Sequence, residues 1–123
     1  MPDLWAQYSE KVVEHFQSPR NVGEMENPDG VARVGNPVCS DVTELYIKVN
    51  DGIIVDAKFR TFGCGAAIAS GSMLTEMLKG KSIEQALQIS NHAVVEALDG
   101  LPEPKIHCSV MAEEALKSAI EDY

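Results

Sequence analysis

The stretch from residue 55 to residue 77 constrains the fold of this chain more than any other. Apolar and charged residues alternate from 55 to 60, which is the period-two pattern of a half-buried strand. No charged residue then appears between Arg60 and Glu76, and this small, apolar segment is typical of a helix at the centre of a fold. The strand is expected to direct three side chains to its buried face: Val55, Ala57 and Phe59.

Cys64 lies between two glycines, at the point where this strand gives way to the helix. Flanking glycines free the backbone and leave room for a bulky group to approach the sulfur. A small core cysteine in a tight turn is the alternative reading, since free cysteine is among the most buried residue types.

The rest of the chain predicts one compact unit of mixed class. Residues 31–35 and 44–49 read as two further strands, and Asp51-Gly52 supplies a hairpin turn before the third. Strands in hairpin order form an antiparallel sheet with one face to solvent. Helices are expected over residues 4–16, with His15 on the surface, from the caps Ser82 and Ser90, and at the C-terminal end. The predicted class is therefore α+β, a small three-stranded antiparallel sheet with helices packed on one face, in a single domain over residues 1–123.

Charge and cysteine usage limit the function classes. The net charge of −9 disfavours nucleic acid or an anionic membrane as the main partner. No apolar run approaches the length of a membrane span, and the N-terminal residues lack the apolar core of a signal peptide. Three cysteines make no paired disulfide framework, so a reducing compartment, the cytoplasm, is expected.

Five candidate site residues lie at boundaries between predicted elements. Cys39 and Asp41 are two apart at the start of a strand, so their side chains are expected to point the same way. Cys64 ends the next strand, and His107 and Cys108 open the last helix, where the helix N-terminus favours thiolate. Functional groups are usually displayed at such boundaries, which predicts one shared site.

Three thiolates with one carboxylate or imidazole suit tetrahedral zinc, and they also suit an iron–sulfur cluster. A harder fourth ligand should make a bound centre easier to release, so the residues predict temporary holding of a metal centre. Whether Asp41 or His107 completes the site is left open. A structural zinc domain is disfavoured because no local Cys-x-x-Cys pair exists, and a zinc hydrolase because the chain lacks a His-rich ligand set.

Four segments resemble the U-type iron–sulfur scaffold family, which comprises IscU and the N-terminal domain of NifU. They cover nearly the whole chain and include all three cysteines in order: YSEKVVEHFQSPRNVG (8–23), GNPVCSD (35–41), FRTFGCGAAIAS (59–70) and LPEPKIHCSVMAEEAL (101–116).

The resemblance implies a non-enzymatic scaffold. A 2Fe–2S cluster would be assembled transiently from iron and from persulfide sulfur supplied by a cysteine desulfurase of the IscS or NifS type, then transferred to apo-proteins. Cys39, Cys64 and Cys108 match the family's three cysteines, and Asp41 matches the carboxylate linked to cluster release. Cys108 would accept the persulfide, with His107 as the alternative ligand, and zinc would occupy the site when no cluster is present.

Two departures from the family pattern bear on exchange and partners. Ser40 stands where the family commonly has glycine. Leu101-Pro102-Glu103-Pro104-Lys105 keeps Leu101, Pro102 and Lys105 of the segment that binds an Hsp70-type chaperone, so chaperone binding and a rigid connector both stay open. The resemblance also suggests a ferredoxin as a partner, and a cluster bridging two copies would make a homodimer. The runner-up function is a zinc-dependent sulfur acceptor of the SufU type, although no insertion is evident between Cys64 and Cys108.

Overall fold

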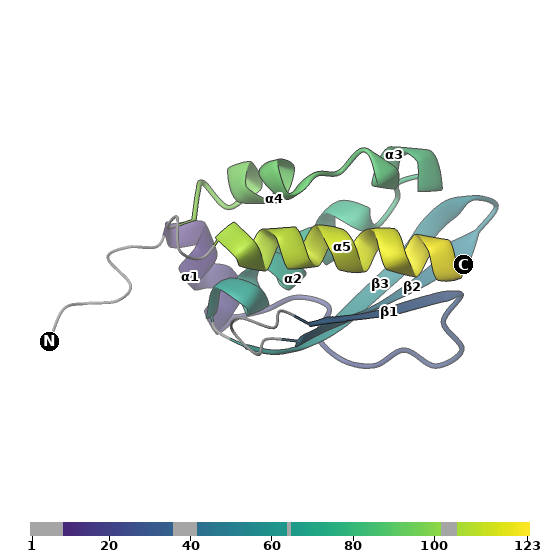
Figure 1. Cartoon of the computed structure of the whole chain (residues 1–123), viewed down its shortest axis with the longest axis horizontal. Helices are drawn as coiled ribbons and strands as arrows, with labels where there is room; N and C mark the ends of the chain where they lie inside the picture. Colours follow the sequence, from purple (N-terminus) through teal and green to yellow (C-terminus); the bar gives the residue numbers. More distant parts are fainter. Residues whose placement is uncertain (1–8, 36–41, 64, 102–105) are drawn as a thin grey trace, which may run out of the picture.

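The structure, a computed structural model, describes residues 9–35, 42–63, 65–101 and 106–123, without the side chains of residues 106 and 107. These residues form a three-stranded sheet and five helices (Figure 1). In chain order the elements are α1 (Glu10–Gln17), β1 (Gly30–Gly35), β2 (Val42–Asn50), β3 (Ile53–Phe62), α2 (Gly65–Leu78), α3 (Ile83–Leu87), α4 (Asn91–Ala97) and α5 (Ile106–Asp122).

The sheet has the order β1-β2-β3, and both neighbouring pairs are antiparallel. The tight turn between β2 and β3 places Asp51 at φ 52° and Gly52 at φ 74°, the positive values that a two-residue hairpin turn needs. The α+β class and the antiparallel sheet predicted from the sequence are therefore confirmed.

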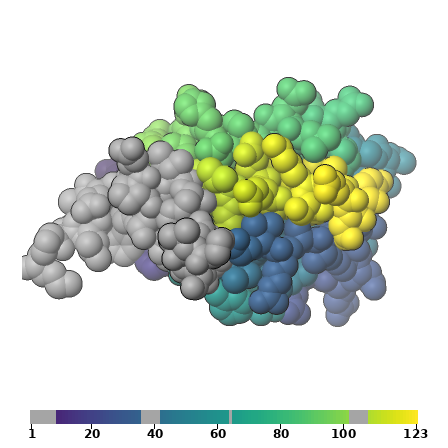
Figure 2. Space-filling view, viewed as in Figure 1, coloured from purple at the N-terminus to yellow at the C-terminus, as the bar shows by residue number. Residues whose placement is uncertain are grey.

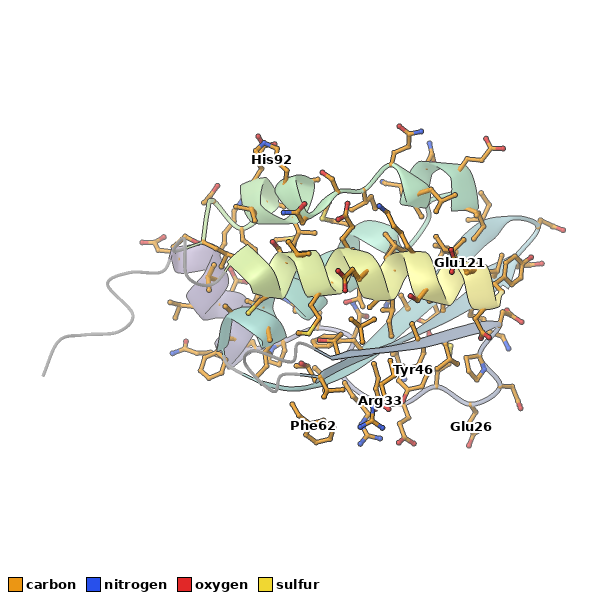
Figure 3. The ribbon with its side chains drawn as sticks, in the orientation of Figure 1. Glu26, Arg33, Tyr46, Phe62, His92 and Glu121 are labelled. Carbon is orange, nitrogen blue, oxygen red and sulfur yellow. The ribbon has the colours of Figure 1, made fainter. Side chains whose placement is uncertain are left out.

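One face of the sheet is buried under helices and the other is not. The buried rows contain Ala32, Leu45 and Phe59, against which α2 and α5 pack. Figure 1 shows the helices on this side of the sheet, and Figure 2 shows α5 at the surface between β1 and the α3–α4 segment. Arg33, Tyr46 and Phe62 point away from the helices on the opposite face (Figure 3).

The predicted inward position of Val55 is wrong. Val55 is 50% exposed, whereas Ile54 is fully buried. The register of β2 and β3 shifts between Lys48 and Val49, since Lys48 pairs with Asp56 but Val49 pairs with Ile54. Val55 is therefore the extra residue of a β-bulge, and a bulge changes which face the following side chains take.

Helix α2 forms the centre of the molecule, as its apolar composition predicts. Ten of its fourteen residues are buried, and it contacts α1, β3, α4 and α5. Its close approach to the sheet depends on Gly71, because a Cβ atom there would lie 2.5 Å from the ring of Phe59.

The helix caps agree with the sequence. Ser82 and Gln85 form a reciprocal capping box at α3, and the Ser90 side chain accepts from the backbone N–H of Ala93 at α4. Gly80, just after α2, has φ 85°. Across the described ranges, no helix combines the length and apolar character needed to cross a bilayer.

Candidate functional site

The predicted ligands Cys39, Asp41 and Cys64 lie outside the described residues, but their described neighbours converge. Residues 36–41 connect Gly35 to Val42, which are directly paired across β1 and β2. Val42 is in turn paired with Phe62 of β3, two positions before Cys64. The chain segments that carry these three residues therefore leave the sheet at the same end of its strands.

Cys108 lies in the first turn of α5 and is 1% exposed. It belongs to a small buried cluster with Ala66 and Ala67, from the first turn of α2, and with Met111. The sequence predicts a functional thiolate displayed at this boundary between elements. The thiol is instead enclosed, because the small alanines of α2 allow the two helix starts to pack closely around it.

The Cys108 cluster packs against the end of the sheet from which the segments with the other cysteines leave. Val34, one residue before the end of β1, packs against the cluster, and Leu101 does so from the segment after α4. Figure 1 shows the first turns of α2 and α5 at the same end of the molecule. The arrangement brings the attachment points of all three cysteines to one end of the fold.

No group of three His, Cys, Asp or Glu side chains in the described part of the chain is arranged to hold a metal ion. His107 is in the first turn of α5, but its side chain is not among those described, and Pro102 and Lys105 lie outside the described residues. The ligand set predicted from the sequence therefore stays a prediction.

An aromatic side chain marks the surface beside this end. Phe62 is 58% exposed, and the guanidinium of Arg60 lies 5.7 Å from its ring centroid. Arg60 also pairs with Glu24 and, at 3.7 Å, with Glu44. These ion pairs hold Arg60 over Phe62 on the face away from the helices.

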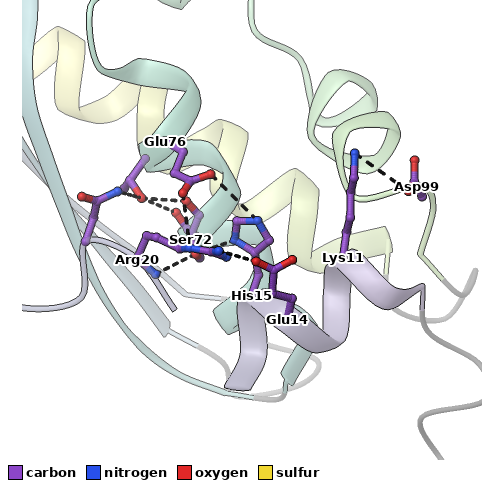
Figure 4. Close-up of polar contacts among 10 residues, drawn as sticks. Lys11, Glu14, His15, Arg20, Ser72, Glu76 and Asp99 are labelled. Carbon is purple, nitrogen blue, oxygen red and sulfur yellow. Dashed lines mark hydrogen bonds and ion pairs between the residues drawn. The ribbon is translucent and has the colours of Figure 1, made fainter. Parts of the chain in front are cut away.

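A polar network fastens α1 and the following residues to α2 (Figure 4). His15 Nδ1 lies 2.7 Å from Ser72 Oγ, and the backbone N–H of Arg20 donates to the same oxygen at 2.9 Å. Ser72 Oγ accepts from Arg20 and keeps its own proton, which it can donate to a neutral His15. Arg20 pairs in addition with Glu14 and, at 3.4 Å, with Glu76.

The predicted surface position of His15 is wrong, since the residue is 5% exposed. Burial, followed by the nearby charge of Arg20, holds the pKa of His15 below its ordinary value, while Glu76 and Glu14 act in the opposite direction. The spacing of His15 three residues after Val12, on the buried side of α1, is the signal that identifies it. A second signal of a buried polar partner is Ser72, because its hydroxyl in the buried helix α2 needs a hydrogen-bond partner.

The glycine after Cys64 has a packing role of its own. A Cβ atom on Gly65 would lie 3.3 Å from the ring of Phe16, so this side chain of α1 packs against the first residue of α2. The position of α1 is thereby coupled to the start of the helix that follows Cys64.

Comparison with known proteins identifies what the chain resembles. The NifU-like N terminal domain family matches residues 7–123. Iron-sulfur cluster assembly scaffold protein IscU 1 of Archaeoglobus fulgidus is 62% identical over 116 residues, which cover 94% of this chain and 76% of that protein. The IscU protein of Escherichia coli K12 is 56% identical over 120 residues, covering 94% and 93% of the two chains.

Solved structures support the fold. A crystal structure from Fervidobacterium islandicum, of a protein described as a scaffold for the SUF system, has a TM-score of 0.80 at 23% identity and covers 96% of this chain and 99% of its own. The N-terminal part of a NifU-like protein from Brucella abortus has a TM-score of 0.63 at 20% identity, covering 97% and 84%. At these identities the similarity concerns the fold alone.

Proposed function

Because the chain belongs to the NifU-like N terminal domain family, we propose that it is a scaffold on which a 2Fe–2S cluster is assembled and from which the cluster passes to apo-proteins. The observation that carries the proposal is the pairing of Gly35, Val42 and Phe62 across the three strands at one end of the sheet, next to the buried cluster of Cys108. This arrangement supports a shared site for Cys39, Cys64 and Cys108. The high identity to IscU proteins supports the same role.

Asp41 and His107 are the two candidates for the fourth ligand. Either would place an oxygen or nitrogen donor beside three thiolates, and such a donor exchanges more readily than a fourth thiolate. This donor set is compatible with a cluster that must leave and with Zn²⁺ when no cluster is bound.

Cys108 is the residue that receives sulfur. Its thiolate attacks the outer sulfur of the desulfurase persulfide, a new S–S bond forms on Cys108, and the desulfurase cysteine leaves as thiolate. Conversion of that sulfur to sulfide consumes two electrons, which a ferredoxin-type donor supplies. The protein binds and orients these reactants without turning over a substrate by itself, so its role is that of a carrier.

The burial of Cys108 adds a requirement to these steps of sulfur transfer. Because Cys108 is 1% exposed and packs with Ala66, Ala67 and Met111, sulfur transfer from another protein requires this cluster to open. Leu101 packs on the same cluster, and it begins the proposed chaperone segment with Pro102 and Lys105. Chaperone binding there would therefore also expose Cys108. Thiol chemistry of this kind needs a reducing compartment, and we expect the protein in the cytoplasm.

The test is anaerobic loading followed by transfer. Incubation with iron, cysteine and a cysteine desulfurase should give a red-brown protein with the absorption spectrum of a 2Fe–2S cluster, and addition of an apo-ferredoxin should move that spectrum to the ferredoxin. A protein that keeps Zn²⁺, develops no colour and still accepts sulfur would instead be a SufU-type sulfur acceptor. A protein that neither develops colour nor accepts sulfur would contradict both functions.

A further inference from the structure

Two threonines face each other on the buried side of the sheet, at the end of the strands from which the segments with the cysteines leave. Thr43 of β2 is directly paired with Thr61 of β3, and Val34 of β1 completes the same row. Thr43 is 4% exposed. Val34 packs against the Cys108 cluster, so this row of three residues borders the candidate site.

The hydroxyl groups form an ordered chain. Thr61 Oγ1 donates to the backbone carbonyl of Val42 at 2.8 Å. Its single proton is thereby used, so the contact of 3.1 Å between the two hydroxyl oxygens is a hydrogen bond donated by Thr43. Thr61 thus binds β2 through both the backbone of Val42 and the side chain of Thr43.

We propose that Thr61, assisted by Thr43, is a positioning residue that sets the separation between the ligands Asp41 and Cys64. Val42 is covalently joined to Asp41, and Thr61 is three residues before Cys64. The bond from Thr61 to the Val42 carbonyl fixes the first residue of β2 against the end of β3, three residues before Cys64. The inference rests on the proposed function, because it assumes that both residues bind the same centre.

The alternative is a role in stability alone, since threonine pairs across antiparallel strands also stabilise sheets. Zn²⁺ affinity separates the two roles, because residues that orient metal ligands typically change affinity by about 10-fold to 100-fold when they are removed. Thr61→Val keeps the shape of the side chain and removes both hydrogen bonds, whereas Thr43→Val removes only one.

The experiment measures Zn²⁺ binding to the full chain by competition with a chelator, together with the absorption spectrum of the Co²⁺-loaded protein and the melting temperature. We expect Thr61→Val to weaken Zn²⁺ binding by about 10-fold and to change the Co²⁺ spectrum. Thr43→Val should have a smaller effect, and Thr61→Ser, which retains the hydroxyl, should restore both readouts.

Thr75→Val is the matched control. Thr75 is also a buried threonine, whose hydroxyl bonds to the backbone carbonyls of Gly71 and Ser72 inside α2 and accepts from the side chain of Asn21. Its loss should lower the melting temperature and leave the Zn²⁺ affinity unchanged. Unchanged affinity in Thr61→Val, failure of Thr61→Ser to restore it, or an equal loss in Thr75→Val would overturn the inference, as would a wild-type protein that binds no Zn²⁺.

The inference and the proposed function fail in different ways. Wild-type protein that binds Zn²⁺ but cannot be loaded with a cluster would contradict the scaffold function and leave the positioning role standing. Wild-type protein that loads and transfers a cluster, with a Thr61→Val variant of unchanged affinity and spectrum, would contradict the positioning role only.

Discussion

His15 Nδ1 lies 2.7 Å from Ser72 Oγ, so a buried contact between residues 57 positions apart joins α1 to α2. Phe16, the next residue of α1, rests on Gly65 at the start of α2. The docking of α1 is therefore continuous with the residues that follow Cys64.

This contact predicts that the protein loses stability in mild acid. The pKa of His15 is held below its ordinary value by burial, so the unfolded chain binds the proton more readily than the folded one. The stabilisation is complete above the unfolded pKa of about 6.5 and is lost as the pH falls from there through the lower pKa of the folded state.

The measurement is the free energy of unfolding by denaturant at pH 7.5 and at several lower values. His15→Asn, whose amide oxygen can accept from Ser72, should remove most of the pH dependence. His92 is exposed and pairs only with Glu96 at 3.0 Å among described groups, so His92→Asn is the control and should retain it. An identical pH profile in wild type and His15→Asn would show that another group is responsible.

Gly30 allows β1 to meet α5. A Cβ atom there would lie 2.3 Å from the carbonyl oxygen of Ala119 and 3.0 Å from Ile47 Cγ1. Because a backbone atom cannot move aside cheaply, Gly30→Ala should destabilise the fold by about 1–3 kcal/mol or more. Denaturant unfolding measures this, with the neighbouring exposed site in Val31→Ala as control. A loss no larger than that of the control would contradict the observed packing.

Asp41 supplies one of the two candidate oxygen or nitrogen donors. If it promotes release, Asp41→Ala should lengthen the lifetime of the bound cluster and slow its transfer to apo-ferredoxin. The decay of the cluster absorption after anaerobic loading gives the lifetime of the bound cluster. The same decay after addition of apo-ferredoxin gives the transfer rate. Transfer at the wild-type rate would assign the exchangeable position to His107, which His107→Ala would then test in the same assay.

Cys108 is the predicted sulfur acceptor. Cys108→Ser should abolish the mass increase of one sulfur atom that the desulfurase produces on the wild-type chain, as read by mass spectrometry under non-reducing conditions. Cys39→Ser serves as the comparison and should retain the increase. An adduct that persists on Cys108→Ser would move the acceptor role to another cysteine.

Features of this fold that depend on neighbours in sequence were predictable. The hairpin turn at Asp51-Gly52, the capping box of Ser82 and the central helix after Cys64 all follow from local residue patterns, and each is present. Recognition of the family also followed from the sequence, because the contexts of three cysteines occur in one order along the chain.

Features that depend on distant partners were not predictable. The hydrogen-bond partner of the buried His15 is Ser72, 57 positions away, and the exposure of Val55 follows from a register shift set by pairing with β2. Cys108 lies four residues before Ala112 on the buried stripe of α5, but its enclosure also depends on Ala66 and Ala67 of α2, which the pattern of α5 does not include. In each case the decisive contact joins elements that a local pattern treats separately.

Zinc-edge X-ray absorption of the Zn²⁺-loaded protein tests most directly whether three sulfurs meet at one centre. The scaffold proposal predicts three sulfur neighbours at roughly 2.3 Å and one oxygen or nitrogen neighbour. Serine at any one of positions 39, 64 and 108 should reduce the sulfur count by one. A wild-type centre with fewer than three sulfurs, or a count that one of these substitutions leaves unchanged, would contradict the shared site.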